Sequence, residues 1–209
     1  MILKVTEVSG DVLRDLKVVD GIIGSSMEGY NIWYVNSCIE LGICNVLIAS
    51  LDDKVVGVGV YYVVNTSPER VGVIYYVVVD RRYRGLGIGK SLIASIEEVL
   101  EGDKVSIYLA TTREGNKVVR KLLTSFGYFE IPLDVGVLGE VLEVIEKITC
   151  GYDDDLLFIK TSQDTVKTLN SLITELGFLT RQDNIEVINR LWRKICYEVW
   201  LRSRRLGNY

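Results

Sequence analysis

Hydrophobic residues recur along this chain with two spacings, and each spacing predicts a different element. Three runs rich in valine and other apolar residues, at positions 46–51, 54–64 and 71–79, are apolar at nearly every position. Such runs are typical of strands in a sheet that helices cover on both faces. Asp52 and Asp53 separate the first two runs. The pair predicts a tight hairpin between them.

Alternating apolar residues predict a half-buried strand at residues 2–8, and shorter apolar runs predict strands at residues 105–109, 128–131 and 156–161. Elsewhere apolar residues recur every three or four positions, which indicates amphipathic helices. These helices are expected at residues 31–41, 88–102, 115–126, 134–148, about 164–176 and 184–205. Asp11 is placed to cap an earlier helix through Val19, and a glycine-rich break at residues 21–29 follows it. The alternation of elements predicts a layered α/β domain.

The last predicted helix carries an apolar stripe that needs a partner. The stripe consists of Ile188, Leu191, Ile195 and Val199, with Trp192 and Trp200 nearby. A free, solvated helix would not keep such a stripe. We therefore expect the tail to dock on its own domain or on a second subunit, as a homodimer through the C-terminal helices.

Neither a membrane span nor a secretory signal is expected. The longest apolar runs, residues 55–64 and 71–79, contain ten and nine residues, whereas a spanning helix needs roughly 20. Lys4 and Glu7 interrupt the first apolar residues, unlike the apolar region of a secretory signal. We expect a cytoplasmic protein whose four cysteines, Cys38, Cys44, Cys150 and Cys196, are buried reduced thiols.

The absence of histidine limits the metal sites and catalytic groups that this chain can form. The chain has 0 His, and its 4 Cys show no Cys-x-x-Cys spacing. This composition argues against zinc sites, Ser-His-Asp triads and Cys-His dyads, so no metal is expected. The net charge of -4 argues against nucleic-acid binding over the whole surface, although six basic residues accompany Glu198 alone between residues 190 and 209.

The most informative segment joins the third valine-rich run to the next helix. It reads Val77-Val78-Val79-Asp80-Arg81-Arg82-Tyr83-Arg84-Gly85-Leu86-Gly87-Ile88-Gly89-Lys90-Ser91. Glycine lets backbone amides approach a phosphate without a Cβ, and a helix N-terminus adds positive partial charge. Four basic side chains, Arg81, Arg82, Arg84 and Lys90, add charge of the same sign. The segment therefore predicts a pyrophosphate site.

Other glycine-rich loops fit this segment less well. A dinucleotide-binding turn would follow the first strand and precede an acidic residue by about 20 positions. This loop follows roughly the fourth predicted strand, and residues 109–112 contain no acid. A P-loop would need glycine at position 84, which is Arg84. A plain connection between a strand and a helix stays open as an alternative.

The segment resembles the acetyl-CoA motif of the GNAT superfamily of acyl-CoA-dependent N-acyltransferases, whose core is Arg/Gln-x-x-Gly-x-Gly/Ala. Arg84, Gly87 and Gly89 occupy its fixed positions. A second stretch is also similar to these proteins in its spacing. Its matching residues are Asn116, Val119, Leu122, Gly127 and Tyr128.

The resemblance implies a GNAT-like α/β fold, with a mixed, mostly antiparallel central sheet covered by helices on both faces. Residues 1–162 would form the acetyl-CoA-binding domain, and residues 163–209 a C-terminal helical extension. The implied cofactor-binding residues are Val77, Val78, Val79, Arg84, Gly85, Leu86, Gly87, Ile88, Gly89, Lys90, Ser91 and Asn116. Val77 and Val79 would act through their backbone, and Asn116 would bind pantetheine, with simple helix capping as its alternative role.

The chain departs from the family pattern where proton transfer is expected. Leu123 stands where many relatives have the tyrosine that protonates the leaving thiolate. Tyr76 and Val77 stand where many have a glutamate base. Tyr75 and Tyr76 should alternate faces, so one of them is expected toward the acyl site as the candidate catalytic residue. Glu69 and Glu114 are alternative water-assisted bases.

The activity that the resemblance implies is transfer of an acetyl group from acetyl-CoA, the acyl-donor substrate, to a primary amine of a small molecule, peptide or protein. Backbone amides of the fourth strand would polarise the thioester oxygen. The alternative is an acyl-CoA-binding regulatory module that has lost turnover, which would account for Leu123. The acceptor depends on variable loops such as residues 21–31 and 65–70.

Overall fold

The computed structural model describes residues 2–7, 12–27, 29–162 and 168–205. Its strands are β1 (Leu3–Glu7), β2 (Asn45–Leu51), β3 (Lys54–Val64), β4 (Val71–Val79), β5 (Ile107–Thr112), β6 (Phe129–Pro132) and β7 (Leu156–Thr161). Its α-helices are α1 (Val12–Ser26), α2 (Tyr30–Glu40), α3 (Ile88–Gly102), α4 (Lys117–Ser125), α5 (Val135–Leu138), α6 (Val141–Thr149), α7 (Leu169–Leu176), α8 (Gln182–Trp192) and α9 (Glu198–Arg205). None of the described helices is both long and apolar enough to cross a bilayer.

The described strands form one mixed sheet in the order β1-β2-β3-β4-β5-β7-β6. β1 with β2, β2 with β3, β5 with β7 and β6 with β7 pair antiparallel. β4 and β5 pair parallel, from Val71 opposite Ile107 to Val73 opposite Leu109. The predicted fold class is confirmed, with a mostly antiparallel sheet, flanking helices and C-terminal helices.

The predicted hairpin between β2 and β3 turns at two aspartates. Asp52 and Asp53 have φ angles of 47° and 63°. Two consecutive positive φ angles match the right-handed twist of the flanking strands in a type I′ turn. The Asp52 carboxylate also accepts a hydrogen bond of 3.0 Å from the Ile2 amide, which holds the start of the chain at this turn.

The chain divides into two compact units. One comprises Met1–Tyr62, Ile74–Gly102 and Lys194–Tyr209, and the other comprises Val63–Val73 and Asp103–Arg193. Each unit has its own buried apolar residues.

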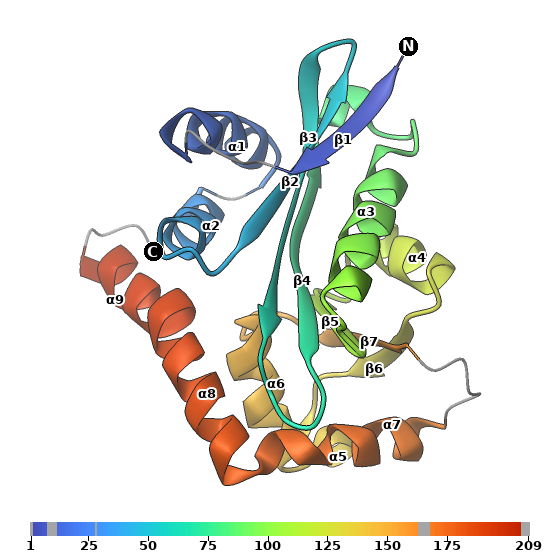
Figure 1. Cartoon of the computed structure of the whole chain (residues 1–209), viewed down its shortest axis with the longest axis vertical. Coiled ribbons are helices and arrows are strands. Elements are labelled where there is room, and N and C mark those ends of the chain that lie inside the picture. Colours follow the sequence, from blue (N-terminus) through green and yellow to red (C-terminus); the bar gives the residue numbers. More distant parts are fainter. Residues whose placement is uncertain (1, 8–11, 28, 163–167, 206–209) are drawn as a thin grey trace. The chain divides into compact units, whose positions relative to one another are not determined.

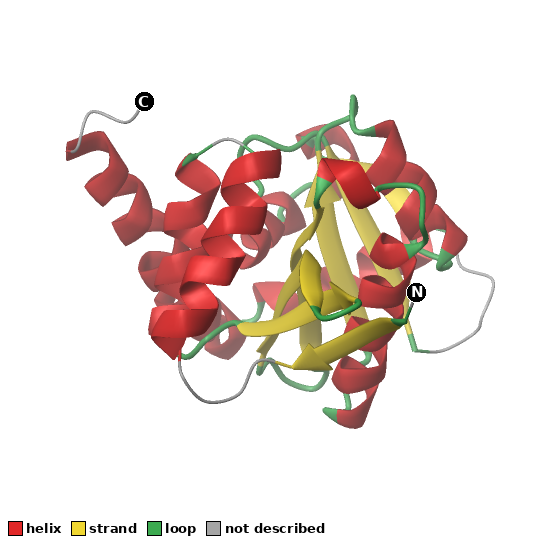
Figure 2. Ribbon diagram, turned by 90° about the horizontal axis from the view of Figure 1, so that it is seen from above, coloured by secondary structure: helices red, strands yellow, loops and turns green. Residues whose placement is uncertain are grey.

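In the first unit, helices flank the strands (Figures 1 and 2). α3 lies on one side, and α1 and α2 lie on the other. Glycines in β3 let α3 approach closely, since a Cβ at Gly59 would stand 2.9 Å from Cδ1 of Ile96. α9 contacts α2, and Ile195 and Val199 of the tail stripe are buried.

In the second unit, α8 packs against α6. Ile188 of α8 is buried, and Leu191 is half-buried. The stripe residues Ile188, Ile195 and Val199 are therefore buried by residues of the same chain, and Leu191 is partly buried. The prediction that the tail docks rather than stays free is confirmed in this form.

Several predicted helix boundaries were wrong. The expected glycine-rich break at residues 21–29 is shorter, because α1 continues to Ser26. The helix expected at residues 134–148 is two helices, since the chain leaves helical geometry at Gly139, where φ is 55°. Asp11, which was expected to cap the first helix, lies outside the described residues. Residues 164–167, where a later helix was expected to begin, also lie outside them.

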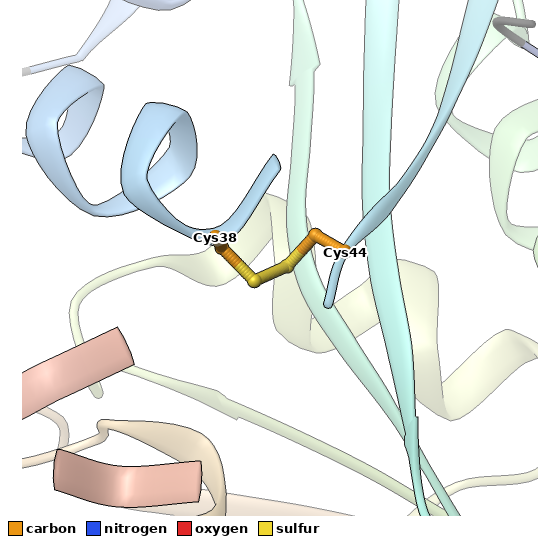
Figure 3. Close-up of a disulfide and its surroundings, with 2 residues drawn as sticks. All are labelled: Cys38 and Cys44. Atoms are coloured by element: carbon orange, nitrogen blue, oxygen red, sulfur yellow. A yellow bond between two sulfur atoms is a disulfide. The ribbon is translucent and has the colours of Figure 1, made fainter. Parts of the chain in front are cut away.

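The prediction of reduced thiols was wrong. Cys38, near the end of α2, forms a disulfide with Cys44, just before β2, and their Cα atoms are 5.2 Å apart (Figure 3). No cysteine in the described ranges is free. The chain turns back after α2, as the hydrogen bond from the Cys44 amide to the Cys38 carbonyl shows. That turn brings the two buried sulfur atoms together. The spacing of the cysteines along the sequence does not predict this contact.

Candidate functional site

The loop after β4 begins with a fixed aspartate. The Asp80 carboxylate accepts hydrogen bonds from the Arg82 amide at 3.0 Å and from Nη2 of Arg82 at 2.6 Å. The Arg82 guanidinium and then the Arg82 amide lower the pKa of Asp80 to about 2. Asp80 thus caps the short turn Arg81–Tyr83, and the charge of Arg82 is paired with it.

Two glycines give the next residues their path. Gly85 and Gly87 have φ angles of 83° and 81°, a region that other L-residues rarely adopt. A Cβ at either position would meet no atom within 4 Å. Backbone conformation, rather than crowding within the protein, therefore requires glycine here.

The first amides of α3 have no acceptor within the helix. The first helical hydrogen bond runs from the Ser91 amide to the Gly87 carbonyl at 3.1 Å. The amides of Ile88, Gly89 and Lys90 precede it, so they have no acceptor within the helix. α3 is 15 residues long, and its dipole adds positive partial charge at this end. The arrangement suits a phosphate group.

Basic side chains accompany these amides. Arg81, Arg84 and Lys90 are exposed. Nε of Arg84 donates to the Val79 carbonyl at 3.1 Å, which ties the guanidinium to the end of β4 and leaves its two Nη groups for another acceptor. The charge of Arg82, in contrast, is shared with Asp80.

The end of β4 presents its backbone at one edge. The Asp80 amide donates to the Val56 carbonyl of β3 at 2.9 Å. Backbone groups alternate between the two edges of a strand, so Val79 faces away from β3, as the bond from Arg84 shows. The same alternation places the Val77 amide at that edge, whereas the Val78 side chain is buried.

Asn116 lies in the second unit, at the start of α4. Its Oδ1 accepts from the Val119 amide at 3.4 Å, and its Nδ2 donates to Oγ1 of Thr112 at 3.1 Å. Its capping role is therefore present. The preceding loop is held by Asp155, whose carboxylate accepts from the Glu114 amide at 2.9 Å. Sequence reasoning missed Asp155, which follows a separate predicted helix.

The position where many relatives carry a proton donor, and the two candidate glutamates, lie in different surroundings. Leu123 is 1% exposed and has no polar group. The Glu69 carboxylate, before β4, accepts a hydrogen bond from the Ser106 hydroxyl. Glu114 is exposed, and its carbonyl accepts from Arg120 at 3.1 Å.

The two candidate tyrosines of β4 belong to one aromatic cluster. The ring centroids of Tyr75 and Tyr76 are 4.6 Å apart, and those of Tyr75 and Tyr62 are 5.4 Å apart, both edge to face. The expected separation of Tyr75 and Tyr76 onto opposite sides is therefore not seen. The Tyr76 hydroxyl donates to Oδ1 of Asn31, on α2, at 3.0 Å.

The two hydroxyl groups differ in their surroundings. Among the described residues, no partner in normal geometry reaches the buried Tyr75 hydroxyl. Burial first, and then the neighbouring phenol of Tyr76, raise the pKa of Tyr75 well above its usual range. Asn31, which is 8% exposed, was missed by sequence reasoning. Its signal was an amide on the buried face of α2, shared with Val35 and Cys38.

Comparison with known proteins gives one family match. Residues 25–128 match the Acetyltransferase (GNAT) family. No protein of curated function matches the sequence.

Solved structures share the fold at low identity. A GNAT-family acetyltransferase from Staphylococcus aureus Mu50 is 14% identical, with a TM-score of 0.59 over 78% of this chain and 100% of that one. The PaiA N-acetyltransferase from Thermoplasma acidophilum, in complex with coenzyme A, is 14% identical, with a TM-score of 0.55 over 77% and 99%. The Escherichia coli N-acetyltransferase YhbS, in complex with CoA, is 19% identical, with a TM-score of 0.52 over 61% and 68%.

Proposed function

Because the chain belongs to the GNAT acetyltransferase family, we propose that it transfers an acetyl group from acetyl-CoA to a primary amine of a small molecule, peptide or protein. The observation that carries this proposal is the loop between β4 and α3. Gly85 and Gly87 adopt positive φ angles there, and the first amides of α3 have no helical acceptor. Backbone amides at a helix N-terminus are suited to the pyrophosphate of CoA.

The proposed donor site uses the residues of this loop and the strand before it. Residues 84–91 surround the pyrophosphate, with Arg84 and Lys90 adding charge. Val77 and Val79 offer backbone groups to pantetheine, with Val78 between them as part of the core. Asn116 retains one Nδ2 hydrogen beyond its bond to Thr112, which is available for the pantetheine chain.

The proposed chemistry is direct transfer. The amine nitrogen attacks the thioester carbonyl, and backbone amides of β4 stabilise the negative charge that develops on its oxygen. CoA leaves as a thiolate, whose reference pKa of about 8.5 makes it a better leaving group than an alkoxide. A tyrosine hydroxyl of β4, from Tyr75 or Tyr76, assists at the acyl site.

A regulatory acyl-CoA-binding module is the competing proposal. Leu123 favours it, because a fully buried leucine at that position supplies no proton. A module of this kind would bind acetyl-CoA and release no CoA when amines are added.

We further propose that residues 1–162 form the donor-binding domain and that residues 163–209 extend it. The buried tail stripe is covered by the chain itself, which supports this role over a homodimer through the C-terminal helices. A cytoplasmic setting fits an intracellular donor. The Cys38–Cys44 disulfide argues against a cytoplasmic setting, because disulfides are rare in cytosolic proteins outside hyperthermophiles.

The test combines binding with turnover. Calorimetry should detect CoA and acetyl-CoA binding, and release of free CoA from acetyl-CoA should accelerate when a panel of primary amines is added. Binding with no acceleration by any amine would support the regulatory module. Absence of binding would overturn both proposals.

A further inference from the structure

The loop after β4 carries more positive charge than a diphosphate requires. The diphosphate of CoA has one negative charge on each phosphate, and the exposed side chains of Arg84 and Lys90 supply one positive charge each. The charge of Arg82 is already paired with Asp80. Arg81 is exposed in the same turn, so its charge remains after the diphosphate has been matched.

A further cation reaches this turn from the start of β3. Nζ of Lys54 lies 5.4 Å from the ring centroid of Tyr83, in the short turn that follows β4. β3 passes beside the turn because its Val56 carbonyl accepts from the Asp80 amide at 2.9 Å. Lys54 is far from the glycine loop in the sequence, and only the pairing of the strands brings it here.

Lys54 and Arg81 are available to an anion from solution. Both are exposed, and neither side chain forms an ion pair or a hydrogen bond with another described residue. The Tyr83 ring attracts the Lys54 ammonium, which limits where that charge is held. The turn thus presents two exposed cations that the described part of the protein does not neutralise.

CoA carries a second anionic group that suits these cations. Its ribose bears a 3′-phosphate, a monoester with about −1.5 to −2 charge near pH 7. The ribose is joined directly to the diphosphate, so the 3′-phosphate must lie near the loop that binds the diphosphate. Two positive charges beside that loop match the charge of this group.

We propose that Lys54 and Arg81 bind the 3′-phosphate of CoA and make the donor site selective for CoA over dephospho-CoA, which lacks that phosphate. The planar guanidinium of Arg81 can engage two phosphate oxygens, whereas Lys54 acts as a point charge. This inference rests on the proposed acetyl transfer, because it concerns the same donor. It assigns a role to a residue of β3 that lies outside the glycine-rich loop.

Calorimetry with CoA and dephospho-CoA isolates this contact, because the two ligands differ by one phosphate. The wild type should bind CoA roughly tenfold more tightly. Lys54→Gln and Arg81→Gln should each reduce this preference, and the double variant should bind both ligands about equally. Lys54→Arg keeps the charge and should keep the preference. Because both cations are exposed, the wild-type preference should also shrink as salt rises from about 0.1 M to about 1 M.

Two lysine variants serve as matched controls. The charge of Lys90 is assigned to the diphosphate, which both ligands carry, so Lys90→Gln should weaken both and leave the ratio of their affinities unchanged. Lys17 is exposed on α1, on the other side of the sheet from α3 (Figure 1). Lys17→Gln should therefore change neither affinity.

The outcomes separate this inference from the proposed function. A wild type that binds both ligands equally, or a double variant of Lys54 and Arg81 that keeps the wild-type preference, would overturn the inference and leave the donor site standing. Loss of the preference in Lys90→Gln to the same extent as in the double variant would also overturn it, since the 3′-phosphate would then lie at the start of α3. A wild type that binds neither ligand would overturn both.

Discussion

Asn184, near the start of α8, holds the backbone of Ser67 on both sides. Its Oδ1 accepts from the Ser67 amide at 2.9 Å, and its Nδ2 donates to the Ser67 carbonyl at 2.8 Å. Nδ2 also donates to the Phe178 carbonyl at 2.9 Å. Asn184 is 2% exposed, so one buried amide fastens the turn between β3 and β4 to the C-terminal helices.

Replacing this amide should loosen the second unit. Asn184→Ala leaves backbone groups of Ser67 and Phe178 without their partner, and we expect it to lower the free energy of unfolding by about 1–3 kcal/mol. Chemical denaturation followed by circular dichroism measures the change. Asn170→Ala, at an exposed position of α7, is the control and should change stability little. Equal stabilities of the two variants would contradict the role given to Asn184.

Glycine at position 87 should matter for CoA binding through its backbone. Gly87→Ala places a Cβ on a residue with φ of 81°, a strain of about 1–2 kcal/mol. The loop is expected to relieve this strain by moving its amides, which would weaken CoA binding about tenfold. Calorimetry with CoA measures the loss.

Gly21→Ala is the control for the loop variant. Gly21 lies in α1, and a Cβ there would meet nothing within 4 Å. Alanine in a helix should raise stability by up to about 1 kcal/mol and leave CoA affinity unchanged. If Gly87→Ala bound CoA as tightly as Gly21→Ala, the pyrophosphate site would have to be sought elsewhere.

The stabilising effect of Asp80 should depend on pH. The hydrogen bonds from Arg82 lower the pKa of the Asp80 carboxyl group in the folded protein from 3.8 to about 2. A carboxyl group with a lowered pKa stabilises the fold above the unfolded value, and the contribution is lost as pH falls through the folded value. Wild type should therefore exceed Asp80→Asn in melting temperature at pH 7, and the gap should shrink between about pH 4 and about pH 2. A gap for Asp80→Asn that persisted at the lowest pH would refute the explanation.

The Cys38–Cys44 disulfide should be measurable and stabilising. Under denaturing conditions without reductant, an alkylating reagent should leave both residues unmodified, as intact mass and peptide mapping can show. The double variant Cys38→Ser, Cys44→Ser should lose about 2 kcal/mol of unfolding free energy, as expected for a short closed loop. Alkylation of both residues in the untreated wild type would disprove the bond.

Strand positions followed directly from the sequence where β-branched residues ran between polar breaks. β4 and β7 have the predicted bounds, Val71–Val79 and Leu156–Thr161. The hairpin at Asp52 and Asp53 was predictable for a similar reason, since turn chemistry is local. The start of α3 at Ile88 was marked by the glycines before it.

Helix boundaries were predicted less well, because glycine has more than one use. Gly21 and Gly24 indicated a break, yet both lie inside α1. A Cβ at Gly24 would stand 3.1 Å from Cδ1 of Ile32, on α2, so this glycine allows two helices to pack closely. Only the packed structure distinguishes that use from a turn.

The sequence by itself determined the fold class and the loop from Arg84 to Ser91, because both depend on residues close together in the chain. Periodicity sets which side of an element is buried, and a glycine with a positive φ is a local requirement. The tertiary structure alone decided that Cys38 meets Cys44 and that Asn31 of α2 binds Tyr76 of β4. These contacts depend on how α2 packs beside the sheet and on how the chain turns after it, and hydrogen bonds of about 3 Å are decided by such packing rather than by spacing along the sequence.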